Sequence, residues 1–186
     1  MKRGPKKKKA GRAGARAGHL YTLEVTITSG LVTEGFARDN PVVSRTIQIR
    51  GSQTLEALHY AIFDAFDRDD AHMYEFQFGK GPRDPEGKRY VLPMAMDDLF
   101  GGEPDIAGDV TETTIASLGL KTDQVFGYWF DFGDDWMHQI NVVAIDEKAP
   151  RGKYPRVTER IGENPPQYVD WEEEEDEEDE EDEEET

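Results

Sequence analysis

Alternating apolar and polar positions predict most of the strands of this chain. Leu20–Ile27 alternates and is rich in β-branched residues, and Val42–Ile49 does the same after a connection containing Gly, Asn and Pro. A period of two is typical of a strand with one buried face, so these segments predict two strands paired as a hairpin. His72–Phe78 predicts a third strand. Residues 88–112 predict mostly loop, apart from a short edge strand at Tyr90–Pro93.

Apolar residues three and four positions apart predict one main helix. Its apolar stripe consists of Leu55, Leu58, Ile62 and Phe66. The helix follows Ser52 and Thr54, residue types that cap helix N-termini. Further along, Thr113–Leu120 predicts only a short helical turn that ends at Gly119.

The last predicted element is an aromatic hairpin over Phe126–Ile145. Within it, Tyr128–Ile140 gathers aromatic residues, carboxylates and one of the four histidines of the chain. The alternation stops at Gly133-Asp134-Asp135, and Gly followed by Asp is typical of a turn or bulge. The pattern therefore predicts a strand, a tight turn and a second strand.

The order of these elements predicts an α+β fold. We expect an α/β roll, a mixed sheet of about five strands with one main helix packed on one face. A length of 186 residues predicts one domain, at residues 19–171. Residues 1–16 carry eight Lys or Arg, and Glu172–Thr186 carries fourteen Asp or Glu. Such blocks repel themselves, so we expect a disordered basic leader (1–18) and a disordered polyacidic tail (172–186).

Charge and composition narrow the function. Residues 17–171 are themselves acidic, which argues against a basic nucleic-acid-binding face on the core. The leader could bind nucleic acid nonspecifically through residues 1–16, contact the acidic tail, or only aid solubility. The absence of cysteine excludes disulfides, thiolate zinc sites and cysteine nucleophiles. No signal peptide or membrane-length apolar run is visible, so we expect a cytoplasmic protein with no membrane partner.

Histidines and aspartates predict a possible metal or acid–base site. If the helix packs across the hairpin, His59, His72 and His138 would converge near Asp131 and Asp134. His59, His72, His138 and Asp134 would suit zinc or another divalent cofactor, and the same groups could perform acid–base chemistry. The alternative is structural: a histidine donates to an aspartate that accepts turn amides. The spacing lacks a His-x-x-x-His or Glu-x-x-His signature, which favours this alternative.

The motifs of the common nucleophilic and nucleotide-dependent enzymes are absent. The chain has no Gly-x-Ser-x-Gly, no Walker loop and no dinucleotide fingerprint. Asp131-Phe132-Gly133 matches the kinase magnesium motif, but no other kinase motif accompanies it. These absences exclude serine hydrolase, NTPase and kinase interpretations.

Four separated blocks resemble the plasmid pRiA4b ORF-3-like family, also described as TnpR-type passenger proteins of an insertion sequence. The blocks are the helix pattern Leu55–Phe66, His72-x-x-x-Phe76, the aromatic segment Tyr128–Ile140 and Tyr154-Pro155-Arg156. The resemblance covers roughly residues 20–170 and implies an α/β roll. It also implies a candidate site made of His59, His72, Asp131, Asp134, Trp136 and His138.

The resemblance implies no activity, so two functions remain open. The favoured one is a non-enzymatic binding or accessory module, associated with plasmid or mobile-element biology. It would present the aromatic hairpin and a Pro-rich segment near the tail to a protein partner. The alternative is a metal-dependent hydrolase or nuclease-like enzyme, with the histidines and one Asp as ligands and a second Asp activating water.

Overall fold

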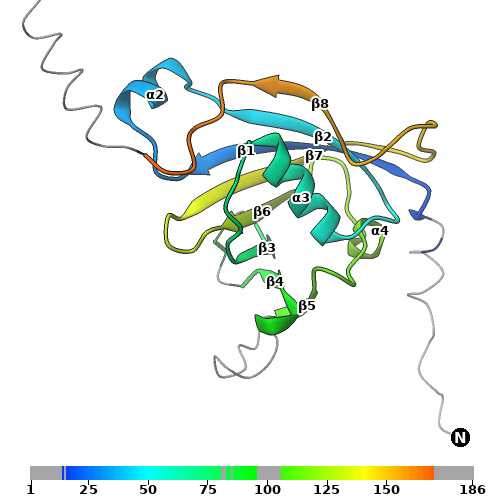
Figure 1. Cartoon of the computed structure of the whole chain (residues 1–186). Coiled ribbons are helices and arrows are strands. Elements are labelled where there is room, and N and C mark those ends of the chain that lie inside the picture. Colours follow the sequence, from blue (N-terminus) through cyan, green and yellow to red (C-terminus); the bar gives the residue numbers. More distant parts are fainter. Residues whose placement is uncertain (1–13, 15, 81–82, 85, 96–105, 170–186) are drawn as a thin grey trace, which may run out of the picture.

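A single mixed β-sheet dominates the protein (Figure 1). The computed structural model describes residues 14, 16–80, 83–84, 86–95 and 106–169. Eight strands follow the spatial order β5-β4-β3-β6-β7-β1-β2-β8, and all neighbours are antiparallel except β4 and β5. The strands are β1 Leu20–Ser29, β2 Ser44–Arg50, β3 Tyr74–Phe78, β4 Lys88–Val91, β5 Ile106–Asp109, β6 Val125–Phe130, β7 Trp136–Asp146 and β8 Arg156–Ile161.

The predicted five-strand sheet with one main helix is wrong. The sheet has eight strands, and the described residues contain three α-helices as well as a 3₁₀ turn. They are α2 Glu34–Asp39, α3 Leu55–Ala65, α4 Ile115–Leu118 and the turn η1 Pro93–Ala95. Strand β8 is an edge strand with mostly exposed side chains, and α2 has no fully buried residue. Neither element needs an apolar face, so neither leaves a periodic signal in the sequence.

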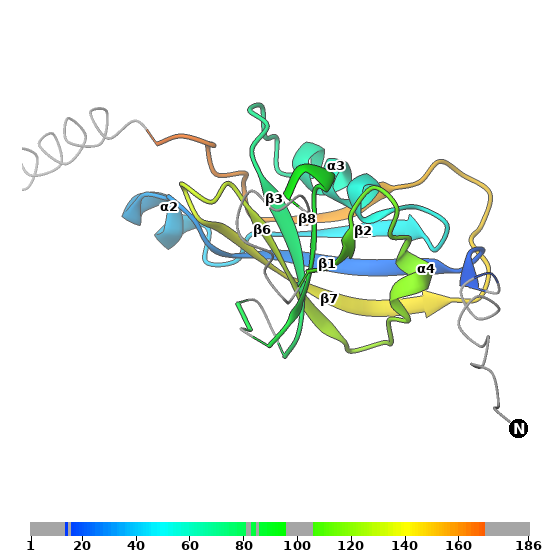
Figure 2. The ribbon, with the colours of Figure 1, turned by 90° about the horizontal axis from the view of Figure 1, so that it is seen from below.

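Helix α3 forms the second layer. Figures 1 and 2 show it lying along one face of the sheet, with α2 at one end of the β1–β2 pair and α4 at the other. The hydroxyl of Thr54 accepts the amide of Ala57 and caps the helix, as the sequence predicts. The buried face of α3 packs against alternate residues of β1, β2, β6 and β7, and this packing makes the core.

The large side chains of the aromatic hairpin pack against α3. Tyr128 lies opposite His138 and Phe130 opposite Trp136 in the β6–β7 pair. The predicted turn is present: Asp131 has a positive φ of 54°, and its Oδ1 accepts the amides of Gly133 and Asp134. An aspartate that accepts amides two and three residues ahead stabilises such a turn without further partners.

A C-terminal strap, defined here as Asn164–Tyr168, returns over the end of α3. The side chain of Gln167 accepts the amides of Asp69 and Asp70 at 2.9 and 3.1 Å and donates to the carbonyl of Asp70. The strap therefore fixes the segment that follows α3.

Several predictions fall outside the described ranges. Of the predicted leader, only residues 14 and 16–18 are described, and the predicted tail at 172–186 lies beyond them. Nucleic-acid contact through residues 1–16 therefore stays a prediction. Within the described ranges, none of the helices has both the length and the apolar content that a membrane span needs.

Candidate functional site

His59 is buried on α3 and engaged with tyrosines. Its Nδ1 lies 2.8 Å from the hydroxyl of Tyr128, and its ring stacks on Tyr74 with 3.6 Å between centroids. Burial lowers the pKa of His59 to about 4. The ring is therefore neutral at neutral pH and acts as part of the core.

His138 is buried on β7 and is also neutral. Its ring lies 5.2 Å from Phe66 and 5.1 Å from Tyr128, centroid to centroid. Burial, together with the nearby charge of Arg68, lowers the pKa of His138 to about 3. Unlike His59, its Nδ1 makes no hydrogen bond within the protein.

His72 and Asp131 meet at the hairpin turn. His72 Nε2 lies 3.4 Å from Asp131 Oδ2 and 3.0 Å from the hydroxyl of Tyr168 in the strap. The other oxygen of Asp131 accepts turn amides, and Asp134 contributes its backbone amide to the same turn. The structural alternative is matched only in part, because His72 is exposed and its Nε2 has the Tyr168 hydroxyl, rather than Asp131, as its hydrogen-bond partner.

The three predicted histidines contact neighbouring aromatic rings but do not meet in one group of metal ligands. In the part of the chain that the structure describes, no three His, Cys, Asp or Glu residues form a group that could hold a metal ion. His72 lies beside Asp131, whereas His59 and His138 both lie beside Tyr128. The structure does not join the three histidines into one ligand set.

Trp136 stacks with Arg68, a residue that the sequence analysis did not select. Both side chains are buried, with exposed fractions of 0% and 6%, and the guanidinium carbon lies 3.8 Å from the indole centroid. Such stacking is a favourable cation–π contact. In the sequence, Arg68 stands in an Asp-Arg-Asp-Asp run that has the appearance of a solvated surface.

Four buried nitrogen atoms of Arg68 and its neighbours have no hydrogen-bond partner in the protein. Arg68 Nη1 donates to the carbonyl of Pro165 at 3.4 Å, but its Nε and Nη2 make no hydrogen bond. The same holds for Trp136 Nε1 and His138 Nδ1. Burial lowers the pKa of Arg68 to about 10, while Tyr128 and Asp131 oppose this shift, so the guanidinium stays charged at neutral pH. We call Arg68, Trp136 and His138 the Arg68 cluster.

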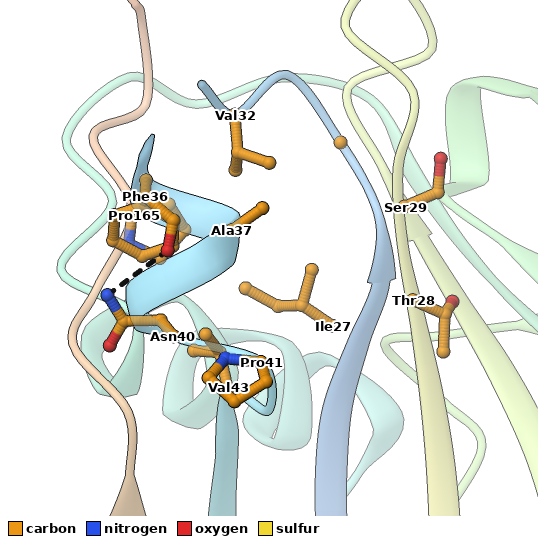
Figure 3. A pocket seen from close by; sticks show the side chains of 11 residues that line it. Ile27, Thr28, Ser29, Val32, Phe36, Ala37, Asn40, Pro41, Val43 and Pro165 are labelled. Carbon is orange, nitrogen blue, oxygen red and sulfur yellow. Dashed lines mark hydrogen bonds between the residues drawn. The ribbon is translucent and has the colours of Figure 1, made fainter. Parts of the chain in front are cut away.

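A pocket of about 300 Å³ lies beside α2 (Figure 3). We call it the α2 pocket, because α2 forms one wall; the end of β1 and the segment between α2 and β2 form others. Its lining residues are Ile27, Thr28, Ser29, Gly30, Val32, Phe36, Ala37, Asn40, Pro41, Val43 and Pro165. The hydroxyl of Thr33 caps α2 by accepting the amide of Phe36, and this contact positions the helix wall.

Two lining residues also contact the Arg68 cluster. A Cβ atom on Gly30 would overlap the ring of Trp136, so the backbone lies directly against the indole. Pro165 accepts the hydrogen bond from Arg68. Gly30 and Pro165 therefore belong to the pocket wall and also contact the cluster.

Comparisons with known proteins support the predicted resemblance. Residues 35–184 match the family described as plasmid pRiA4b ORF-3-like protein. The uncharacterized protein y4hQ of Sinorhizobium fredii is 29% identical over 130 residues, which cover 69% of this chain and 60% of that protein. The chain thus spans less than two thirds of that relative's length.

A solved structure has a similar fold. The crystal structure of a protein of unknown function from Methanosarcina mazei Go1 aligns with a TM-score of 0.56 and 24% identity. The alignment covers 76% of this chain and 69% of the other, and it is informative for the fold alone. The family match extends over most of the chain, so the predicted family is confirmed: this protein belongs to the plasmid pRiA4b ORF-3-like family.

Proposed function

We propose that this protein is a non-enzymatic accessory module, acting in plasmid or mobile-element biology, whose α2 pocket binds an apolar side chain of a partner protein. The pocket itself carries this proposal. The side chains of Ile27, Val32, Phe36 and Val43 line it together with Pro165 of the Pro-rich segment. The family description supports the biological setting.

The size and surroundings of the pocket suit one anchoring side chain. Ligand pockets commonly span roughly 300 to 1,000 Å³, so a pocket of about 300 Å³ accepts a small group. Leu31 and Val42, neighbours of two lining residues, are 41% and 50% exposed. These side chains offer further apolar surface that a bound segment would cover.

Charge around the pocket favours a partner with basic residues. Glu34 and Asp39 are exposed on α2, where Arg38 offsets the charge of Asp39, and the backbone of Glu163 is hydrogen-bonded to Asn40 of the pocket wall. The whole chain has a formal net charge of −18. We therefore expect the apolar anchor to be flanked by Lys or Arg, with binding weakened by salt.

The enzyme alternative finds less support. The described residues contain no group of three metal ligands, and the pKa values of His59 and His138 lie well below neutral pH. A general base works best with a pKa near the operating pH. We therefore do not propose a hydrolase.

The proposal is tested with a library of random peptides displayed with free C-termini. The library is selected on the full chain and then compared on two variants. Ala37→Trp fills the pocket from the exposed side of α2, and Ala107→Trp makes the same change on the exposed edge strand β5. We expect enriched peptides to carry an apolar residue beside basic ones and to bind Ala37→Trp at least about tenfold more weakly.

Ala107→Trp is expected to bind the enriched peptides as the wild type does. Equal binding to wild type and Ala37→Trp, or the absence of any enriched sequence, would overturn the proposed function.

A further inference from the structure

We infer that the α2 pocket recognises the free C-terminal carboxylate of its partner segment through the Arg68 cluster. This inference rests on the proposed function and names the chemistry that the pocket selects. The partner would end in an apolar residue, with its side chain in the pocket and its carboxylate at Arg68.

The unpaired edge of Arg68 has the geometry of a carboxylate receptor. The guanidinium stacks on Trp136, which leaves its N–H groups directed outward from its edges. Nη1 contacts the strap, while Nε and Nη2 form the unpaired edge. Two parallel N–H groups on one guanidinium edge match the two oxygens of a carboxylate and bind it in bidentate fashion.

The other two side chains of the Arg68 cluster also carry a nitrogen without a hydrogen-bond partner. Trp136 Nε1 has no protein partner, and neutral His138 supplies another N–H group when its hydrogen is on Nδ1. A buried donor left without a partner costs about 1–3 kcal/mol, so the three donors on Arg68 and Trp136 are together unfavourable until an acceptor reaches them. The cluster therefore provides hydrogen-bond donors and a positive charge, which together suit an anionic hydrogen-bond acceptor.

The carboxylates of the chain do not satisfy this need. Asp131 raises the pKa of Arg68 from a distance, but its own oxygens are engaged by turn amides and by His72. Within the described residues, no acidic side chain forms an ion pair with Arg68.

The α2 pocket provides the approach to Arg68. Gly30 lets the backbone lie against the Trp136 indole, and Pro165 forms both a pocket wall and the one hydrogen-bond acceptor of Arg68. Because Arg68 Nε and Nη2 are buried, the strap must shift at Pro165 for a carboxylate to reach them. The bond that holds Pro165 to Arg68 is long, at 3.4 Å, and the carboxylate would replace it with shorter, charge-assisted bonds.

The test compares N-acetyl-leucine with N-acetyl-leucinamide, which share the side chain and differ in the carboxylate. Binding to the full chain is measured by calorimetry at neutral pH and constant ionic strength. We expect the acid to bind at least about tenfold more tightly than the amide, a difference of about 1.4 kcal/mol. In Arg68→Met this preference disappears, whereas Arg38→Met, which removes an exposed arginine of α2, keeps it.

A second measurement does not depend on a folded Arg68 variant. In the wild-type chain, the indole N–H resonance of Trp136, assigned with Trp129→Phe and Trp171→Phe, should shift saturably with the acid but not with the amide. Equal affinity for acid and amide would overturn the inference and leave the proposed function standing. An acid preference that survives in Arg68→Met would also overturn the inference, and so would the absence of binding by either compound. The peptide library then tests the proposed function separately.

Discussion

Two buried arginines in this protein lie in opposite situations. Arg45 is 2% exposed and Arg68 is 6% exposed, and each places its guanidinium over an aromatic ring. Arg45 donates to five acceptors, which are the carbonyls of Ser44, Ala65, Ile161 and Gly162 and the side chain of Asn164. Arg68 donates to Pro165 alone.

The difference separates a structural arginine from a candidate binding arginine. Arg45 joins the end of α3, the edge strand β8 and the strap, so its charge holds three chain segments together. Arg68 holds the strap by one long bond and keeps an edge unpaired. Both arginines are buried to a similar extent, and they differ in the number of hydrogen-bond acceptors that each guanidinium contacts.

Replacement of Arg45 should have the largest effect. Arg45→Met removes five charge-assisted hydrogen bonds, two of them buried, and we expect unfolding to become easier by about 3–5 kcal/mol. Urea denaturation measures this change. A loss below about 1 kcal/mol would show that other donors replace Arg45 and would remove the contrast with Arg68.

Acidification should have an intermediate effect for each buried histidine, because the same contrast recurs in the histidines. His59 has a tyrosine partner and His138 Nδ1 has none, yet both have lowered pKa values. A histidine with a folded pKa below its unfolded value of 6.5 contributes full stability above pH 6.5 and loses it as pH falls toward the folded pKa. For His59, a fall from 6.5 to about 4 corresponds to roughly 3 kcal/mol.

Urea denaturation between pH 7 and pH 4 measures this loss. His59→Gln removes one of the two titrating histidines. The free energy of unfolding of this variant should therefore fall less between pH 7 and pH 4 than that of the wild type, whatever the stability of the variant at pH 7. Stability that stays constant down to pH 4.5 would mean that both rings accept protons in the folded state.

Replacement of Arg68 should have the smallest effect on stability. Arg68→Met keeps an apolar contact with the Trp136 ring and removes two unpaired donors, so we expect a change within about 1 kcal/mol in either direction. The same urea measurement applies. Destabilisation as large as that of Arg45→Met would make Arg68 a structural residue and remove the basis of the carboxylate site.

The sequence predicts the elements that bury an apolar face. The helix at Leu55–Ala65, the antiparallel pairing of the first two strands and the turned aromatic hairpin are present, because the core imposes periods of 3.6 and 2 on them. The short edge strand predicted at Tyr90–Pro93 overlaps β4, which spans Lys88–Val91. Strands β5 and β8 and helix α2 were missed, since they are short or at an edge and lack such a period.

The candidate site is only partly accessible to sequence reasoning. The hairpin motif in the sequence indicates Trp136 and His138 as candidate residues. However, Trp136 is fully buried, so it is not among the aromatic side chains that the hairpin presents to a partner. Arg68 could not be selected, because its burial depends on the strap, a segment about one hundred residues away in the chain. The role of the six predicted residues stays a prediction.

The position of Pro165 has a consequence for protein synthesis. The last strand of the sheet ends at Ile161, but one wall of the α2 pocket comes from the strap beyond it. A nascent chain that has emerged only as far as β8 contains the eight strands of the described sheet but lacks the wall of the α2 pocket that Pro165 forms. Partner capture would therefore begin only after translation has passed this proline, and a truncation at Gly162 would separate sheet formation from binding.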